Sequence, residues 1–156
     1  MAFEVRRVVT GHDENGKAIV LFDDVMTEVI SFRPGMDSHV AWATDRLPAD
    51  NTIATPAKVT ATTVDQGSVF RIIRFSPGVT PRIHRTESID YAVVLSGSID
   101  MELDDSTVTL NAGDMLVQRG TIHNWINKGT EPCVMVFVLV SAVPLQIGQT
   151  TLKAEG

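Results

Sequence analysis

The sequence contains a single cysteine and no long hydrophobic run. Because Cys133 has no second cysteine to pair with, an internal disulfide and a C-x-x-C metal knuckle are both excluded. The longest apolar run, Cys133 to Val140, is far shorter than the ~20 residues that a transmembrane helix needs. The N-terminus lacks the apolar core of a signal peptide. We therefore expect a soluble, cytoplasmic protein in which Cys133 is a buried, inert thiol.

Clusters of basic residues and nucleotide-binding motifs are absent as well. With 19 acidic and 13 basic residues, the formal net charge is -6, which argues against nucleic-acid phosphate as a partner. The sequence has no P-loop, G-x-G-x-x-G or G-x-S-x-G motif, so we expect neither a nucleotide cofactor nor a hydrolase triad. A chain of 156 residues is the size of one ordinary domain and needs no disulfide to fold.

Helical periodicity is also missing from the chain. Short runs rich in β-branched residues alternate instead with Gly, Pro, Asn and Asp, and Asn15-Gly16 supplies the positive φ values of a tight hairpin. This regular spacing predicts an all-β chain that forms a sandwich or barrel. The predicted strands cover residues 6–10, 18–22, 28–32, 38–44, 69–75, 90–95, 99–103, 107–110, 115–118, 123–126 and 133–140.

We predict one domain, residues 1–156, with an N-terminal arm of extra strands (1–60), a core barrel (61–143) and a C-terminal tail (144–156). A polar stretch around residues 47–57 contains two prolines and should form a surface loop. The segment from Val134 to Val140 is apolar on both alternating faces, so one face can fill the barrel while the other packs on the arm or on a second copy of the chain. We therefore predict a homodimer.

Two segments of the chain resemble the signature motifs of the cupin superfamily. The segment Gly78–Gly97 resembles the first motif, G-x5-H-x-H-x3/4-E-x6-G. It keeps the first histidine as His84, but Thr86 stands in the place of the second histidine and Asp90 in the place of the glutamate. In a complete cupin these side chains and the histidine of the second motif hold one divalent metal.

The segment Gly113–Asn127 resembles the second motif, G-x5-P-x-G-x2-H-x3-N, in a form one residue shorter. Its histidine is His123, and Gln118 stands in the place of the proline. The strings HRT, DYAVVLSG and VQRGTIHNW are similar to those of one subgroup of small stand-alone cupins from bacteria and fungal secondary-metabolite clusters. The resemblance implies a double-stranded β-helix of the jelly-roll type. It leaves the activity open, because cupins range from dioxygenases, isomerases and decarboxylases to sugar-binding domains.

Two histidines and a shortened carboxylate remain of the metal site that the resemblance implies. His84, Asp90 and His123 would face one another inside the barrel, and two imidazoles with a carboxylate can hold Fe, Zn or Mn. Asp is one methylene shorter than Glu, so Asp90 could instead accept a hydrogen bond from an imidazole in a metal-free pocket. Both alternatives use His84, Asp90 and His123 as the catalytic residues, and only the first uses them as metal ligands.

Four further residues are predicted to contact a small organic ligand in the barrel. Arg71 and Arg74 lie at odd separation on one predicted strand and must face opposite sides, so only one can look inward. We assign Arg74 to the ligand, as an anchor for a carboxylate or enolate. Thr86, Gln118 and Trp125 are assigned to the same pocket, Trp125 as part of an aromatic wall.

Two functions from different classes follow from this site. The first is a metal-dependent lyase, isomerase or dioxygenase-like enzyme for an oxygenated organic acid or polyketide-like compound, with a metal-free variant in which His84 or His123 is the general base. The second is a metal-free binding or sensing module without turnover.

Overall fold

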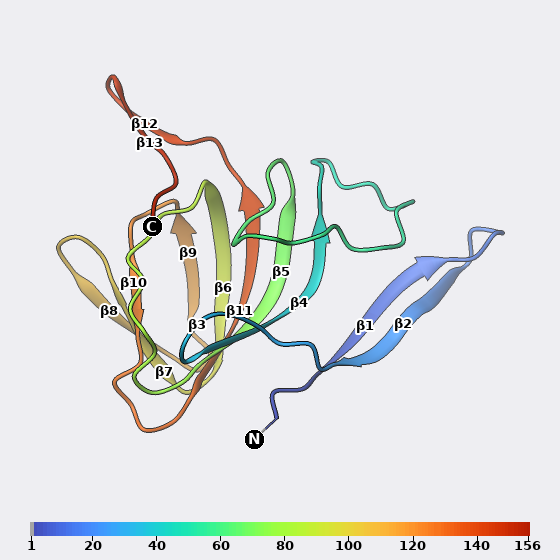
Figure 1. The fold of residues 1–156 in the computed structure, drawn as a ribbon. Helices are drawn as coiled ribbons and strands as arrows, with labels where there is room; N and C mark the ends of the chain where they lie inside the picture. The colour runs from blue at the N-terminus through green and yellow to red at the C-terminus, as the bar shows by residue number, and fades with distance from the viewer. Residues whose placement is uncertain (1) are drawn as a thin grey trace.

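The computed structural model describes residues 2–156 and is built from short antiparallel strands (Figure 1). The described residues contain no helix, and therefore none long and apolar enough to cross a membrane. The all-β prediction is confirmed. The strands are β1 Val5–His12, β2 Ala18–Met26, β3 Ile30–Arg33, β4 Met36–Thr44, β5 Ser68–Phe75, β6 Ser88–Ser96, β7 Ser98–Glu102, β8 Thr107–Asn111, β9 Met115–Arg119, β10 Asn124–Ile126, β11 Cys133–Ser141, β12 Leu145–Ile147 and β13 Thr150–Leu152.

Two sheets form the opposite walls of a barrel (Figure 1). One wall is a six-stranded sheet in the order β3-β4-β5-β11-β6-β9, and the other is a three-stranded sheet in the order β10-β7-β8. The first joins strands far apart in the sequence, since β11 pairs with both β5 and β6. The hydrophobic core lies between the two walls.

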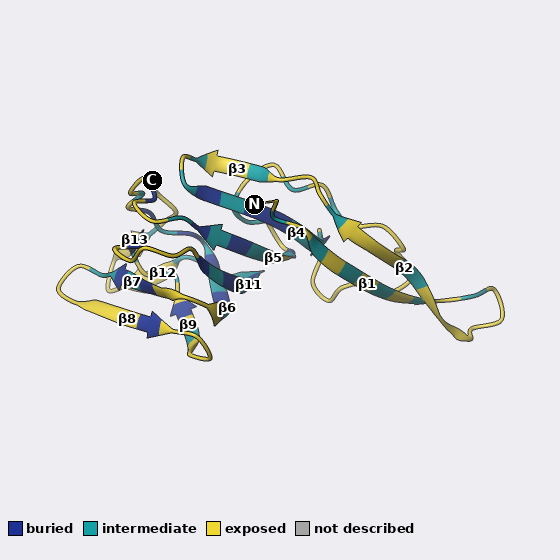
Figure 2. Cartoon of the chain, turned by 90° about the horizontal axis from the view of Figure 1, so that it is seen from below, coloured by how far each residue is buried: buried dark blue, intermediate teal, exposed yellow. Residues whose placement is uncertain are grey.

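Side-chain alternation along the central strands explains this core. On β11, the inward residues Cys133, Met135, Phe137 and Leu139 are buried, while the valines between them are half-buried on the outer face. β5 and β6 alternate in the same way, and Figure 2 shows the buried positions running through the six-stranded sheet. The inert, buried state expected of Cys133 agrees with its burial, which raises the pKa of this thiol to about 11.

The register of the large sheet brings distant polar residues into one row. Asp90 on β6 is paired with Gln118 on β9 on one side and with Leu139 on β11 on the other. Arg71 on β5 is paired with Phe137 on β11 in the next inward row. Because paired positions point to the same face, a carboxylate, an amide and a guanidinium all enter the barrel.

Two hairpins project from the barrel. The β1–β2 ribbon forms a sheet of its own and extends away from the barrel, and the segment 45–67 between β4 and β5 is a loop (Figure 1). The short β12–β13 hairpin was not predicted. After it the chain returns to the barrel, where Arg85 and Glu155 form an isolated antiparallel bridge.

Candidate functional site

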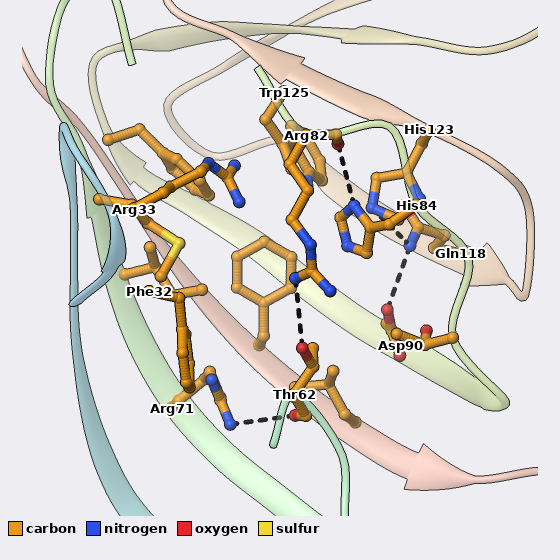
Figure 3. A pocket seen from close by; sticks show the side chains of 16 residues that line it. Phe32, Arg33, Thr62, Arg71, Arg82, His84, Asp90, Gln118, His123 and Trp125 are labelled. Carbon is orange, nitrogen blue, oxygen red and sulfur yellow. Dashed lines mark hydrogen bonds between the residues drawn. The ribbon is translucent and has the colours of Figure 1, made fainter. Parts of the chain in front are cut away.

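The barrel contains a cavity between its two walls, with about 500 Å³ of empty space including its mouth. Arg33 and Arg71 lie on one side of the cavity and two imidazoles and a carboxylate on the other, with Arg82 between them (Figure 3). The predicted residues His84, Thr86, Asp90, Gln118, His123 and Trp125 all line it. The structure therefore brings together every predicted site residue except Arg74.

Backbone pairing places the two histidines beside each other. The amide of His84 donates to the carbonyl of His123 and the amide of His123 donates to the carbonyl of His84, both at 3.0 Å. The ring centroids are 4.2 Å apart. This bridge joins the segment before β6 to the segment before β10, which explains why two distant motifs meet in one site.

Hydrogen bonds to carbonyl oxygens fix the tautomer of both imidazoles. Nδ1 of His84 lies 3.0 Å from the Arg82 carbonyl oxygen, and Nδ1 of His123 lies 2.9 Å from the Thr121 carbonyl oxygen. A carbonyl oxygen can only accept, so each Nδ1 carries the proton and each Nε2 keeps its lone pair. Among residues 2–156, Nε2 of His84 has no hydrogen-bond partner.

A chain of hydrogen bonds connects Asp90 to the second histidine. The amide Nε2 of Gln118 donates to Oδ2 of Asp90 at 3.1 Å and lies 3.3 Å from Nε2 of His123. The hydroxyl of Ser88 donates to Oδ1 of Asp90 at 2.6 Å, and Oγ1 of Thr86 lies 2.8 Å from Oγ of Ser88. Both oxygens of Asp90 and the lone pair of His123 are thus engaged, while His84 stays open to the cavity.

Burial shifts the pKa values of the three titratable residues. Desolvation, with repulsion from His123 as a smaller cause, lowers the pKa of His84 to about 4. Burial also lowers the pKa of His123, and it raises the pKa of Asp90 against the opposing effect of its hydrogen bonds to Ser88 and Gln118. Both imidazoles are therefore neutral at pH 7.

A three-ligand metal site was one of the two alternatives that the sequence left open for His84, Asp90 and His123. Among the described residues, no group of three or more His, Cys, Asp and Glu side chains is placed to hold a metal ion. The Gln118 amide lies between two of the three predicted ligands, since its Nε2 donates to Oδ2 of Asp90 and lies 3.3 Å from Nε2 of His123. The lone pair on Nε2 of His84 is unused among the described residues, and metal binding itself stays a prediction.

The arginine on β5 that lines the cavity is Arg71, not Arg74. The two lie on opposite faces, as predicted, but Arg74 is outside the barrel, where its Nη2 donates to Asp37 at 2.6 Å and its guanidinium lies over the ring of Phe3. Arg71 is 2% exposed and donates to the carbonyl oxygens of Ala61 and Thr62. The assignment of Arg74 to the pocket is therefore corrected to Arg71.

The cavity is also lined by two arginines that the sequence analysis did not single out. Arg82 donates to Thr62 Oγ1 at 3.3 Å and to the Gly156 carbonyl oxygen at 2.7 Å, and Arg33 enters from the end of β3 (Figure 3). Arg82 has the same parity as His84, so alternation could have indicated it. Arg33 comes from a hairpin end, where alternation gives no such signal.

Aromatic side chains close the apolar part of the cavity. Trp125 on β10 is 4% exposed, and its ring stands edge-on to that of His123 at 5.8 Å between centroids. Phe75 and Phe137 each lie 5.9 Å from Trp125. The predicted aromatic wall is therefore present, and it packs directly against one imidazole.

Comparison with known proteins agrees with this architecture. Residues 71–139 match the model of the cupin domain. The chain is 40% identical over 157 residues to the phomopsin biosynthesis cluster protein C' of Diaporthe leptostromiformis, covering 90% of this chain and 80% of the relative. It is 35% identical to the cupin-domain-containing oxidoreductase fogC of Aspergillus ruber, and the match covers 87% of this chain and 72% of the relative.

Solved structures share the fold at low sequence identity. The cupin domain of Schizosaccharomyces pombe Cnp3 aligns with a TM-score of 0.53 at 9% identity and covers 87% of both chains. An RmlC-like cupin from Shewanella frigidimarina aligns with a TM-score of 0.50 at 13% identity and covers 74% of this chain and 84% of its own. The jelly-roll prediction is confirmed. Because the chain is 35–40% identical to relatives that it matches over more than two thirds of their length, it belongs to the cupin family.

Proposed function

We propose that this cupin is an enzyme that removes a proton from the carbon next to a carbonyl group of a small oxygenated organic acid. The observation that carries the proposal is the open Nε2 of His84, whose Nδ1 proton is held by the Arg82 carbonyl. A neutral imidazole fixed in this way, at the cavity of the barrel, has the geometry of a general base.

The charges of the cavity suit the charge that develops during this step. When Nε2 of His84 takes the proton, the electron pair of the C–H bond moves toward the carbonyl oxygen and leaves an enolate. Arg82 lies between the imidazoles and the remaining arginines in Figure 3, so its guanidinium can stabilise that oxygen. The imidazolium of His84 then returns the proton to another carbon in an isomerase, or to a leaving group in a lyase.

The low pKa of His84 is compatible with this role because the substrate is an anion. In the free protein the imidazole has a pKa of about 4 and would be a weak base at neutral pH. A bound organic anion offsets the positive charge of the arginines in the cavity, which favours the charged imidazolium and raises its pKa toward the working pH. The base is therefore strengthened only when the substrate occupies the cavity.

Gln118 and Asp90 support the second imidazole. The amide of Gln118 donates to His123 and is itself held by Asp90, so His123 stays neutral and does not compete for the substrate proton. The neutral state of His123 also keeps a second positive charge away from His84. In this proposal Asp90 and Gln118 position His123, and His84 touches the substrate.

Deuterium exchange tests the proposal without knowledge of the natural substrate. Phenylpyruvate carries a carboxylate, an enolisable carbon and an aromatic ring, and loss of its CH₂ proton signal in D₂O is followed by NMR. The wild type should accelerate exchange over buffer, and His84→Gln should return it to the buffer rate. His12→Gln is the control, since His12 is an exposed histidine at the end of β1.

The same assay separates the alternatives. Exchange that needs added Fe(II), Zn(II) or Mn(II) and is lost with EDTA would support the metal-dependent form of the enzyme. Binding of phenylpyruvate without any exchange would contradict the proposal and leave a binding or sensing module.

An oxidation is the second candidate, and the names of the relatives favour it. Aspergillus ruber fogC is described as an oxidoreductase, and the Diaporthe leptostromiformis relative belongs to a biosynthesis cluster. Removal of the same proton exposes an electron-rich enolate that dioxygen can oxidise. Oxygen uptake during the exchange assay, absent in His84→Gln, would support this candidate, and exchange without oxygen uptake would leave the isomerase or lyase.

A further inference from the structure

The cavity contains more positive than negative charge. Its lining includes the guanidinium groups of Arg33, Arg71 and Arg82 but only one carboxylate, that of Asp90. None of the ion pairs formed by residues 2–156 includes Arg33 or Arg71. With both imidazoles neutral, the cavity has a clear excess of positive charge.

Several donors at the arginine side have no partner. Nε of Arg71 and both Nε and Nη2 of Arg33 are buried without a hydrogen bond among the described residues. Arg71 does use its Nη2, which donates to the Thr62 carbonyl oxygen at 3.0 Å and to the Ala61 carbonyl oxygen at 3.4 Å. Those bonds fix the orientation of the guanidinium and leave its Nε edge for another acceptor.

Burial of these donors is costly unless an anion joins them. A buried guanidinium that lacks a counter-ion loses its hydration without an equivalent interaction in return. Desolvation lowers the pKa of Arg71 only to about 10, so the side chain keeps its charge at neutral pH. Asp90 is the one negative charge that acts on Arg71, where it raises the pKa against desolvation, and an anionic acceptor in the cavity would add a second.

The surroundings of the two arginines restrict the body of such an anion. The guanidinium of Arg71 lies 5.8 Å from the ring centroid of Phe32, and Phe75, Trp125 and Phe137 line the space toward the imidazoles. In Figure 3, Arg33, Phe32 and Arg71 lie on one side of the cavity and His84, His123 and Asp90 on the other. An anion on the arginine side would direct its apolar body toward His84.

We propose that Arg71 anchors a carboxylate subsite, which selects small aromatic or unsaturated organic acids and directs their apolar body toward the imidazole of His84. The carboxylate accepts from the guanidinium of Arg71, the ring packs between Phe32 and Trp125, and Arg33 adds positive charge to the lining of the same cavity. The inference rests on the proposed function only for the role of His84, because the subsite itself follows from the unpartnered arginines.

A matched pair of ligands tests the charge requirement. Benzoate and benzamide have the same ring and nearly the same shape, but only benzoate is an anion. Titration calorimetry with the wild type should show benzoate binding at least about tenfold more tightly than benzamide, as expected for charge-assisted bonds to arginine. Equal affinity for the two ligands, or no binding of benzoate, would overturn the proposal.

Matched arginine variants of β5 test the location. Arg71→Gln should weaken benzoate binding about tenfold and leave benzamide unchanged, and Arg33→Gln should act in the same direction. Arg74→Gln is the control, because Arg74 is on the same strand but outside the barrel. If Arg74→Gln weakened benzoate as much as Arg71→Gln, the subsite would be misplaced.

The variants also separate this inference from the proposed function. Arg71→Lys keeps the positive charge but loses the forked donors. It should bind benzoate with an affinity between those of the wild type and of Arg71→Gln. Exchange of phenylpyruvate that persists unchanged in Arg71→Gln would sink the subsite and leave the role of His84 standing. Benzoate binding that depends on Arg71, together with no exchange in the wild type, would support the subsite and refute the role of His84 as general base.

Discussion

At the residue scale, Gln118 is the side chain on which the polar network depends. Its amide nitrogen serves both Asp90 and His123, and it stands where related motifs have a proline. Its Oε1 is buried without a partner among the described residues, so it can accept a hydrogen bond from a ligand. A residue of this kind stabilises the protein and shapes the cavity at the same time.

Replacing Gln118 by Leu should destabilise the fold. The change removes both donated bonds and leaves the buried Oδ2 of Asp90 without that partner, which should lower the free energy of unfolding by about 1–3 kcal/mol. Urea unfolding measures this. Gln146→Leu, at an exposed position of β12, is the control and should change stability by less than about 0.5 kcal/mol. Equal losses in both variants would contradict the buried network.

The lowered pKa of His84 predicts how stability depends on pH. Its pKa is about 4 in the folded protein and about 6.5 when unfolded, so between these values the unfolded chain binds more protons. The free energy of unfolding should therefore fall by about 2 kcal/mol through this residue as the pH drops from 6.5 to 4, after allowing for solvent at the cavity mouth. The lowered pKa of His123 acts in the same direction, and the raised pKa of Asp90 opposes it.

Unfolding free energies measured across this pH range check the prediction. His84→Gln should flatten the dependence, while His12→Gln, at an exposed position, should leave it unchanged. A dependence in His84→Gln as steep as in the wild type would show that other groups control acid stability.

At the element scale, the turn between β6 and β7 requires glycine for two reasons. Gly97 has φ +77°, and a Cβ at this position would lie 2.5 Å from the Pro132 carbonyl oxygen. Gly113 has φ +92°, but a Cβ there would meet no atom within 4 Å. Backbone strain is thus common to both turns, and close approach to the start of β11 is particular to Gly97.

The two alanine variants should differ in stability for this reason. Gly113→Ala should cost about 1–2 kcal/mol from the left-handed backbone alone. Gly97→Ala should cost a further ~1–3 kcal/mol, because β11 must shift to admit the methyl group. Chemical unfolding of both variants measures the difference, and equal costs would mean that the contact with Pro132 relaxes freely.

The elements also show what a sequence of this kind can predict. The eleven predicted strands are present because β-branched runs between turn residues are a strong local signal. Alternation also put Arg71 and Arg74 correctly on opposite faces of β5, but it did not identify which face is the inner one. Both faces carry apolar residues, namely Val69, Ile73 and Phe75 on one and Phe70 and Ile72 on the other. Relative orientation is local information, whereas the choice of the inner face depends on the partner sheet.

The missed features of the site and fold have physical reasons of their own. The bond between Gln118 and His123 depends on how β9 and the following segment pack, which no spacing reveals. The β12–β13 hairpin has strands of three residues, too short for a periodic signal. The unpartnered donors of Arg33 become visible only when the neighbours of β3 are known.

At the scale of the whole molecule, the homodimer remains a prediction, and the outer face of the six-stranded sheet is the surface that would form it. Tyr91 and Val117 are 49% and 58% exposed there, on the adjacent strands β6 and β9. Neighbouring valines of β11 are only half-buried. An apolar sheet face of this kind is typical of a surface that pairs with a second copy.

Lysine substitutions on that face test the dimer. The wild type should sediment as a dimer, and the double variant Tyr91→Lys, Val117→Lys should sediment as a monomer because two charges would be buried in the interface. Val108→Lys on β8, at a position 41% exposed on the opposite wall, is the matched control. A monomeric wild type would refute the prediction directly.

The packing of Trp125 against His123 gives the protein an optical signal of its own. Only two tryptophans are present, and the other, Trp42, packs near Phe22 outside the cavity. In a Trp42→Phe variant the fluorescence would come from the indole inside the barrel, beside an imidazole whose protonation quenches emission. Entry of a ligand and gain of a proton at the site could then be followed by light alone, in real time and without a label.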